Sequence, residues 1–159
     1  MVIGILGILS AAVIIAVNPT EQIHKAQDAN KKVAAHDFFN ALTQYSTQKN
    51  AFPWDPVAMG GVGCNGGIAP SSPIQVSSPA FDSCLDALMG TGDLKASFKS
   101  SPEIQSLYLT DKSGISGFTI SVCFAPSSST DSKEALTKYL QNGDGGCDNS
   151  TSSCYWCAE

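Results

Sequence analysis

Arginine is absent from this chain of 159 residues, and its two histidines, His24 and His36, both lie in the first quarter of the sequence. Residues 52–159 carry five lysines against eleven acidic residues, which gives this region a net charge of −6. Proteins that bind nucleic acids directly gather Lys and Arg against the phosphates, so we expect no nucleic-acid binding by this region. It also has no histidine to activate a serine or cysteine nucleophile, and we expect neither enzymatic activity nor a cofactor.

Cysteine is absent from residues 1–63, whereas six cysteines follow. An even number of cysteines in a small region rich in glycine and serine is typical of a disulfide framework formed in an oxidising compartment. Six cysteines can pair in several different ways. Because two of the candidate bridges close short loops, we expect these pairs: Cys64 with Cys84, Cys147 with Cys154, and Cys123 with Cys157.

Cys154 and Cys157 form a CxxC motif, which in other settings indicates zinc binding or redox chemistry. A zinc site needs a second pair of ligands at close spacing, but there is no second CxxC and both histidines lie far from this motif. A thioredoxin-like site needs its first cysteine at the start of a helix, and this motif lies close to the last residue of the sequence. We therefore expect no metal and no redox site at the motif.

Charged residues are absent from Val2–Val17 (VIGILGILSAAVIIAV), which Asn18 and Pro19 terminate. As a helix this run would span about 24 Å, somewhat less than the roughly 30 Å of a bilayer core, so it predicts a short membrane anchor. A secretory signal peptide is the alternative, but no basic residues precede the run and no small-residue cleavage site follows it. Pro19 predicts a kink or loosened turn between Ala16 and Thr20, with Asn18 or Thr20 capping the helix that continues.

Residues 20–51 show the pattern of an amphipathic helix. Apolar side chains recur at helical spacing and form one face, at Ile23, Ala26, Val33, Phe38, Ala41, Leu42 and Tyr45. Charged and amide side chains occupy much of the remaining surface. The chain is therefore expected to have three parts: an apolar helix over residues 1–19, an amphipathic helix over 20–51, and a globular head over 52–159.

The N-terminal pattern resembles the helix of type IV pilins and of their relatives, the pseudopilins of type II secretion and competence systems. The resemblance covers Val2–Trp54 and rests on the run VIGILGILSAAVIIAVNP and on the segment TQYSTQKNAFPW, which resembles the end of the family's helix. It implies that Val2–Val17 is a membrane anchor before assembly and the filament core afterwards, and that Pro19 centres a loosened helical segment. The filament-core positions it implies are Val2, Ile3, Ile5, Leu6, Ile8, Leu9, Val13, Ile14, Ile15 and Val17.

Three features of that family have no counterpart in this sequence. They are a short basic leader ending in glycine, an aromatic residue after it, and a glutamate at the fifth mature position. We therefore expect Met1 to stand several residues into the family's helix. No residue here takes the role of the family's cleavage and methylation site, or of its glutamate.

The function that the resemblance implies is that of a structural subunit, a pilin, of an extracellular filament that polymerises through its N-terminal helix and serves adhesion, motility or DNA uptake. Its partners would be identical subunits, the membrane before assembly, and a pilus or secretion assembly machinery. Two alternatives stay open: a pseudopilin, and a monomeric membrane-anchored binding module. Lys25, Lys31 and Lys32 favour a cytoplasmic head, but the cysteines favour an exported one, and we expect the head on the cell surface.

The head is expected to be of the α+β class, with a small antiparallel sheet laid across the amphipathic helix. Residues 52–80 are rich in proline and glycine and predict a surface loop. The expected elements are a β-hairpin from Ser106–Thr110 and Gly117–Phe124, an edge strand at Cys154–Ala158, a short helix within Phe81–Phe98 and another at Ser132–Gln141. The expected core joins the helix to the strands through Phe38, Leu42, Tyr45, Leu107, Leu109, Ile120 and Val122.

Asn142–Asn149 (NGDGGCDN) combines acidic, amide and glycine residues. Asp144 and Asp148 are candidate Ca²⁺ ligands, as in some pseudopilin heads, but the spacing differs from an EF-hand, and an Asx turn closed by a cysteine explains the same residues. Asn149 begins an N-glycosylation triplet, and Ser127–Ser129 are candidates for O-linked sugar. Solvated loops are the alternative for both.

Overall fold

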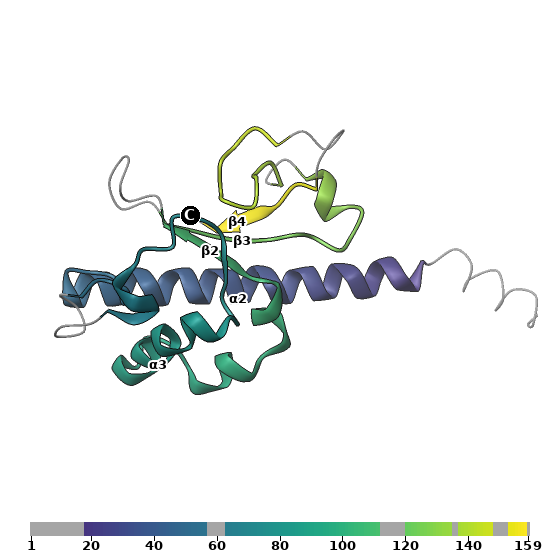
Figure 1. Cartoon of the computed structure of the whole chain (residues 1–159). Helices are drawn as coiled ribbons and strands as arrows, with labels where there is room; N and C mark the ends of the chain where they lie inside the picture. The colour runs from purple at the N-terminus through teal and green to yellow at the C-terminus, as the bar shows by residue number, and fades with distance from the viewer. Residues whose placement is uncertain (1–17, 57–62, 112–119, 135–136, 148–152, 159) are drawn as a thin grey trace, which may run out of the picture.

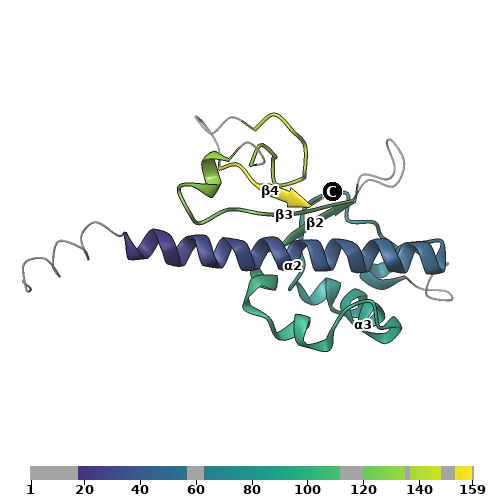
Figure 2. The same cartoon turned by 180° about the vertical axis from the view of Figure 1, so that it is seen from behind.

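A computed structural model describes residues 18–56, 63–111, 120–134, 137–147 and 153–158. Helix α2 (Pro19–Lys49) runs along most of the molecule (Figure 1). It is followed by η1 (Cys64–Gly67), β1 (Ile74–Gln75), η2 (Pro79–Phe81), α3 (Asp82–Thr91), η3 (Ala96–Ser100), η4 (Pro102–Ser106), β2 (Tyr108–Asp111), β3 (Ile120–Phe124), η5 (Asp131–Lys133) and β4 (Trp156–Ala158). Strands β3 and β4 and the C-terminal segment lie on one side of α2, and α3 lies on the other, as Figure 2 also shows from behind.

Helix α2 has a side-chain cap at its start and a left-handed residue at its end. Asn18 Oδ1 accepts a hydrogen bond from the Glu21 N–H (3.4 Å), and Pro19 occupies the first turn, where its missing N–H removes no helical hydrogen bond. Asn50 ends the helix with a φ of 54°, a conformation that Asn tolerates better than most residues. Of the two expected caps, Asn18 is the one that forms. The kink predicted between Ala16 and Thr20 is not tested, because residues 16 and 17 lie outside the described part of the chain.

Four antiparallel strands form one sheet in the order β1-β2-β3-β4. Leu109 lies opposite Val122 in the β2–β3 pair, and Cys123 lies opposite Cys157 in the β3–β4 pair. The predicted hairpin and the predicted edge strand near the C-terminus are therefore confirmed. Residues 112–119, which join β2 to β3, lie outside the described part of the chain.

The core lies between α2, the sheet and α3. The Phe38 ring stacks on Phe98 with ring centroids 5.5 Å apart and meets Phe81 edge-on at 6.2 Å. The residues expected to join the helix to the strands all belong to one buried cluster: Phe38, Leu42, Tyr45, Leu107, Leu109, Ile120 and Val122. The α+β class and the packing of the helix on the sheet are thus confirmed, and Phe38 is a packing residue.

Helix α3 forms the layer on the opposite side of α2 from β4. It buries Leu85 and Leu88 in the core, and its position confirms the short helix predicted in this region. On its outer face, Lys99 Nζ lies 2.8 Å from a carboxylate oxygen of Asp82 and 2.8 Å from one of Asp86. These exposed ion pairs connect η3 to α3, and each adds little to the free energy of unfolding.

The prediction of a helix over Ser132–Gln141 is wrong. A single 3-10 turn, η5, forms at its start, and Glu134 already has extended backbone angles (φ −62°, ψ 149°). Tyr139 then pairs with Tyr155 through an antiparallel bridge. Helix propensity contributes only tenths of a kcal/mol per residue, so pairing with the C-terminal segment outweighs it here.

Residues 52–80 do not form a loop that lies wholly on the surface, as the composition had suggested. Phe52, Trp54 and Val76 are buried in the core, with exposed fractions of 6%, 3% and 0%. Ile74 and Gln75 form β1, which the sequence had not indicated, at the edge of the sheet beside β2. Composition rich in proline and glycine marks turns, and it does not report the apolar side chains between them.

Candidate assembly surface

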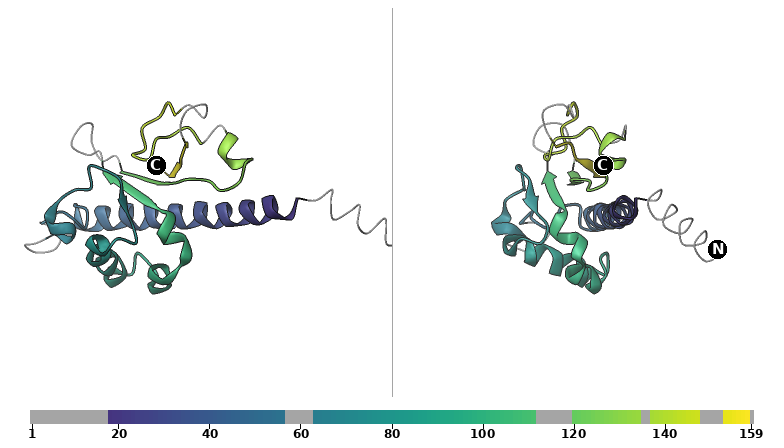
Figure 3. Two further views of the ribbon diagram at one scale, coloured as in Figure 1. Left: turned by 45° about the vertical axis from the view of Figure 1, so that its right-hand side comes forward. Right: turned by 90° about the vertical axis from the view of Figure 1, so that its right-hand side faces the viewer.

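The N-terminal part of α2, residues 19–27, begins past the end of the head (Figure 1) and contacts the head at Glu21. None of its residues is buried, and the first buried residue along the helix is Asp28. Ile23 in this part is 57% exposed. In the end-on view of Figure 3, α2 lies at the margin of the head with one side uncovered. The apolar sequence Val2–Val17 adjoins this end of the helix.

Asp28, the first buried residue of α2, fixes the head to the helix. Its fully buried carboxylate accepts hydrogen bonds from the Ser127 N–H (2.8 and 3.0 Å) and the Ser128 N–H (2.7 Å), which lie in residues 127–134, here called the serine loop. Lys31 Nζ lies 3.0 Å from Asp28 Oδ1. Burial alone would raise the pKa of Asp28, but these hydrogen bonds and the lysine charge outweigh it and hold the pKa below its ordinary value of 3.8. The carboxylate is therefore charged and well paired.

Two further side chains of α2 bind the serine loop. Glu21 Oε1 accepts a hydrogen bond from the Thr130 N–H (3.1 Å). Lys32 Nζ lies 3.1 Å from Asp131 Oδ1 and 3.2 Å from Glu134 Oε2. Burial would lower the pKa of Lys32, but the two carboxylates outweigh burial and raise it. The loop is thus attached to α2 at three successive points, with Asp28 between the other two.

A groove lies between α2 and the segment that carries η3 and η4, with a cavity volume of about 600 Å³. One wall consists of α2 residues spaced three or four apart: Asn30, Val33, Asp37, Asn40 and Gln44. The opposite wall includes Asp93, Lys95, Ser97 and Glu103, and Ala34, Ala41, Leu94 and Phe98 add apolar surface. Three carboxylates against one ammonium make the groove acidic. Val33, at 61% exposed, gives it an uncovered apolar side chain.

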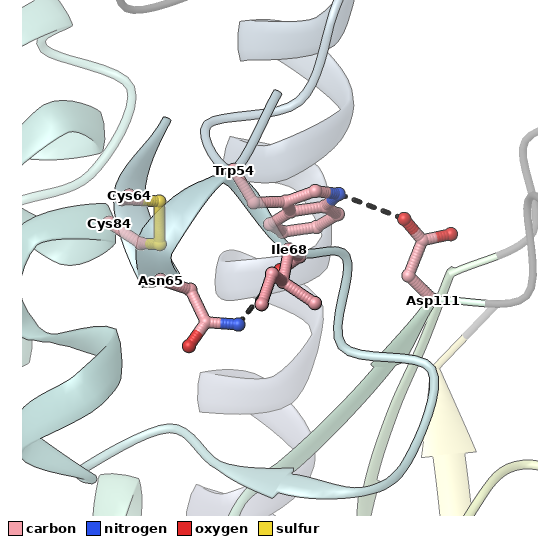
Figure 4. The surroundings of a disulfide bond; sticks show 6 residues. All are labelled: Trp54, Cys64, Asn65, Ile68, Cys84 and Asp111. Carbon is pink, nitrogen blue, oxygen red and sulfur yellow. Dashed lines mark hydrogen bonds between the residues drawn. A yellow bond between two sulfur atoms is a disulfide. The ribbon is translucent and has the colours of Figure 1, made fainter. Parts of the chain in front are cut away.

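The disulfide between Cys64 and Cys84 ties the segment after α2 to α3 (Figure 4). Beside it, Asn65 adopts a left-handed conformation (φ 53°), and its Nδ2 donates a hydrogen bond to the Ile68 carbonyl oxygen (2.8 Å). This turn leaves Ile68 67% exposed. Residues 63–81 carry no charged side chain, so this segment is electrically neutral.

Gly63 approaches the backbone of Trp54 so closely that no side chain fits. A Cβ at this position would lie 2.0 Å from the Trp54 carbonyl oxygen and 2.5 Å from its carbon. Trp54 is held in place, because its Nε1 donates a buried hydrogen bond to Asp111 Oδ2 (2.9 Å; Figure 4). We expect Gly63→Ala to lower the free energy of unfolding by about 3 kcal/mol in a denaturant titration.

Gly90→Ala is the matched control for this substitution. A Cβ at Gly90 meets no atom within 4 Å, and the residue lies within α3, where alanine is the better helix former. We expect this variant to be as stable as the native chain or slightly more so. Equal losses for the Gly63 and Gly90 variants would contradict the clash.

The structure contains the three disulfides that the sequence predicts. They are Cys64 with Cys84, Cys123 with Cys157, and Cys147 with Cys154, at sequence separations of 20, 34 and 7. The second bridge links β3 directly to β4. The third lies in the C-terminal segment, where the Cys147 N–H also donates a hydrogen bond to the Lys138 carbonyl oxygen (2.9 Å).

The filament-core positions within Val2–Val17 lie outside the described residues, as do Asp148 and the glycosylation candidate Asn149. Asp144 is exposed, and its N–H and Oδ2 bond to Asn142 (3.1 and 2.6 Å), which is the Asx-type turn given as the alternative to calcium binding. Within the described ranges, no group of three or more His, Cys, Asp or Glu side chains is placed to hold a metal ion. No helix in those ranges has both the length and the apolar character to cross a membrane.

The contact between Asp28 and the serine loop was not predicted from the sequence. Of the sugar candidates Ser127–Ser129, Ser128 is buried, and its Oγ accepts a hydrogen bond from the Asp131 N–H (2.9 Å), so it is not open to modification in the folded protein. One signal was present, because Asp28 lies two helical turns before Ala35 and therefore continues the helix face that Ala35 and Leu42 bury. A charged residue at such a position indicates a buried partner.

The described arrangement provides three surfaces suited to binding another molecule. They are the projecting part of α2, the acidic groove, and the neutral turn at Ile68. The first two both involve α2, and the third lies in the segment that follows α2 along the chain. No family model, curated protein or solved structure matches this chain.

Proposed function

We propose that the chain is the structural subunit of a helical extracellular filament of the type IV pilin kind. The observation that carries the proposal is the projection of α2 past the head at the end that adjoins the apolar run. Residues 19–27 are unburied, and Val2–Val17 carries no charge. The association of apolar helices out of water lowers the free energy of the system, while the acidic heads stay hydrated. One helix therefore serves first as membrane anchor and then as polymer core.

The attachment of the head to α2 supports the same proposal. Glu21, Asp28 and Lys32 bind the serine loop along the N-terminal half of the helix. A helical polymer repeats one contact between unlike surfaces, so its subunits need a fixed angle between helix and head. These charged hydrogen bonds fix that angle where a change would have the largest effect on the neighbouring subunit. The three disulfides suit a head that works outside the cell.

The test is a substitution on the projecting part of α2. Ile23 is 57% exposed, so Ile23→Asp should change the free energy of unfolding of the monomer by no more than about 0.5 kcal/mol. In a filament the aspartate would lie among packed helices, where an unpaired charge is costly. We expect the number of filaments in sheared surface material, counted by negative-stain microscopy, to fall at least about tenfold.

Thr47→Asp is the matched control, because Thr47 is an exposed residue near the other end of α2. It should leave the filament count within about twofold of the native chain. Absence of filaments when the native chain is produced and exported would reject the proposal. Short assemblies confined to the periplasm would favour a pseudopilin instead, and a stable monomer on the membrane would favour an anchored binding module.

A further inference from the structure

The acidic groove presents carboxylates that the described part of the chain does not neutralise. Asp37 and Glu103 line it, and neither side chain has a hydrogen bond or ion pair with the described residues. Val33 lines the same groove and is 61% exposed. Ser101, also in the groove, has a buried Oγ without a hydrogen-bond partner in the described ranges. The groove thus combines an apolar side chain with acceptors for a cation.

A segment of complementary character lies in the C-terminal part of the head. Tyr139 pairs with Tyr155 and Gly145 in antiparallel bridges, so residues 137–140 are extended and alternate in direction. Thr137 is buried and Tyr139 is half-buried, whereas Lys138 and Leu140 are exposed. Leu140 is 42% exposed, and the Lys138 ammonium has no partner among the described residues. We call these two outward side chains the Lys138–Leu140 strip.

The strip and the groove lie on opposite sides of α2. In Figures 1 and 2 the C-terminal segment lies above the helix, and the segment with η3 and η4 that forms the groove wall lies below it. The end-on view in Figure 3 agrees. Within one molecule the two surfaces therefore do not meet. A contact between two unlike surfaces repeats from subunit to subunit, and it builds an open filament wherever the rotation between subunits does not close a ring.

We propose that the Lys138–Leu140 strip of one subunit docks in the acidic groove of a second copy, with Lys138 against Asp37 and Glu103 and Leu140 against Val33. This inference rests on the proposed function, since it names the contact between heads in the filament. Charge selects the strip over the neutral turn at Ile68, which offers no cation to the groove. A cavity of about 600 Å³ has room for two such side chains.

Photo-crosslinking in cells that produce the full chain tests the contact. A photoreactive residue placed at Val33 should capture a second copy, and mass mapping should locate the crosslink within residues 137–141. Capture of the Ile68 turn, or of a different protein, would overturn the inference. Because a crosslink reports the contact whether or not long filaments form, microscopy of the same cells tests the proposed function separately.

Charge-reversal variants test the proposed pairing of Lys138 with Asp37. Asp37→Lys and Lys138→Glu should each lower the crosslink yield by about fivefold, and the double variant should return it to within about twofold of the starting value. Lys49→Glu, which changes an exposed lysine of α2 outside the groove, is the control and should have no such effect. Additive losses in the double variant would overturn the pairing. Filaments with unchanged crosslinking in all variants would overturn it too, while leaving the proposed function standing.

Discussion

Replacement of Asp28 by alanine is expected to lower the free energy of unfolding by about 3 kcal/mol. The substitution leaves the Ser127 and Ser128 N–H groups without the acceptor that lies 2.7 to 3.0 Å away in the native chain. It also leaves the ammonium of Lys31, 3.0 Å from the lost oxygen, without its partner carboxylate. Ser128 is buried, so water does not readily replace that acceptor.

Two further variants separate the contributions to this loss. Asp28→Asn keeps the size of the side chain but removes the charge, and we expect it to cost about 2 kcal/mol. Asp37→Ala removes an exposed carboxylate from the same helix and should change the free energy of unfolding by no more than about 0.5 kcal/mol. Guanidinium titration with the disulfides intact measures all three. A loss for Asp28→Ala no larger than for Asp37→Ala would show that the serine loop is not held by this carboxylate.

Acid should weaken the same contact. The pKa of Asp28 is lowered in the folded protein because the hydrogen bonds and Lys31 outweigh burial, whereas in the unfolded chain it is close to the ordinary value of 3.8. The contribution to stability is therefore fully present above that ordinary value. It is lost as the pH falls below it and through the lower pKa of the folded state.

The pH dependence has its own control. The native chain and Asp28→Asn are compared between about pH 6 and pH 2, and the difference in their free energies of unfolding isolates the contribution of Asp28. We expect that difference to be constant down to about pH 4 and to shrink below it. A difference that stays constant throughout would contradict a lowered pKa.

The long helix and the core were predictable because their signals are local and periodic. Phe38, Leu42 and Tyr45 repeat at helical spacing, and Ile120, Val122 and Phe124 alternate as a strand does. Each pattern specifies one apolar face, and such faces have few ways to cover one another in a small head. Two of the disulfide pairs were expected because they close short loops, which is also a local property, and Cys123 with Cys157 was the pair that remained.

The remaining features depend on contacts between distant parts of the chain. Asp28 and Ser127 are 99 residues apart, and the local sequence pattern around either residue does not predict the contact. The failed helix at Ser132–Gln141 has the same origin, because Glu134 binds Lys32 of α2 and Tyr139 pairs with the C-terminal segment. The groove too is assembled from α2 and from residues 93–103, so neither stretch reveals it alone.

Removal of the Cys123–Cys157 disulfide by a double alanine substitution should lower the free energy of unfolding by about 4 kcal/mol. The bridge spans 34 residues, and the entropy of the unfolded chain that it restricts corresponds to about 4 kcal/mol, against about 2 kcal/mol for Cys147–Cys154, which spans 7. Thermal unfolding of both double variants, followed by circular dichroism, tests the order. Equal losses would show that chain entropy does not govern the two bridges.

Removal of the Cys123–Cys157 bridge should also expose the edge of β3. β4 has only three residues, and the bridge fixes it to β3, all five residues of which are buried. A three-residue strand without its covalent link separates readily, and β3 would then present unpaired N–H and C=O groups at an apolar edge. Such an edge recruits strands from other molecules. We therefore expect this variant, but not the Cys147–Cys154 variant, to aggregate irregularly on warming, as light scattering would detect.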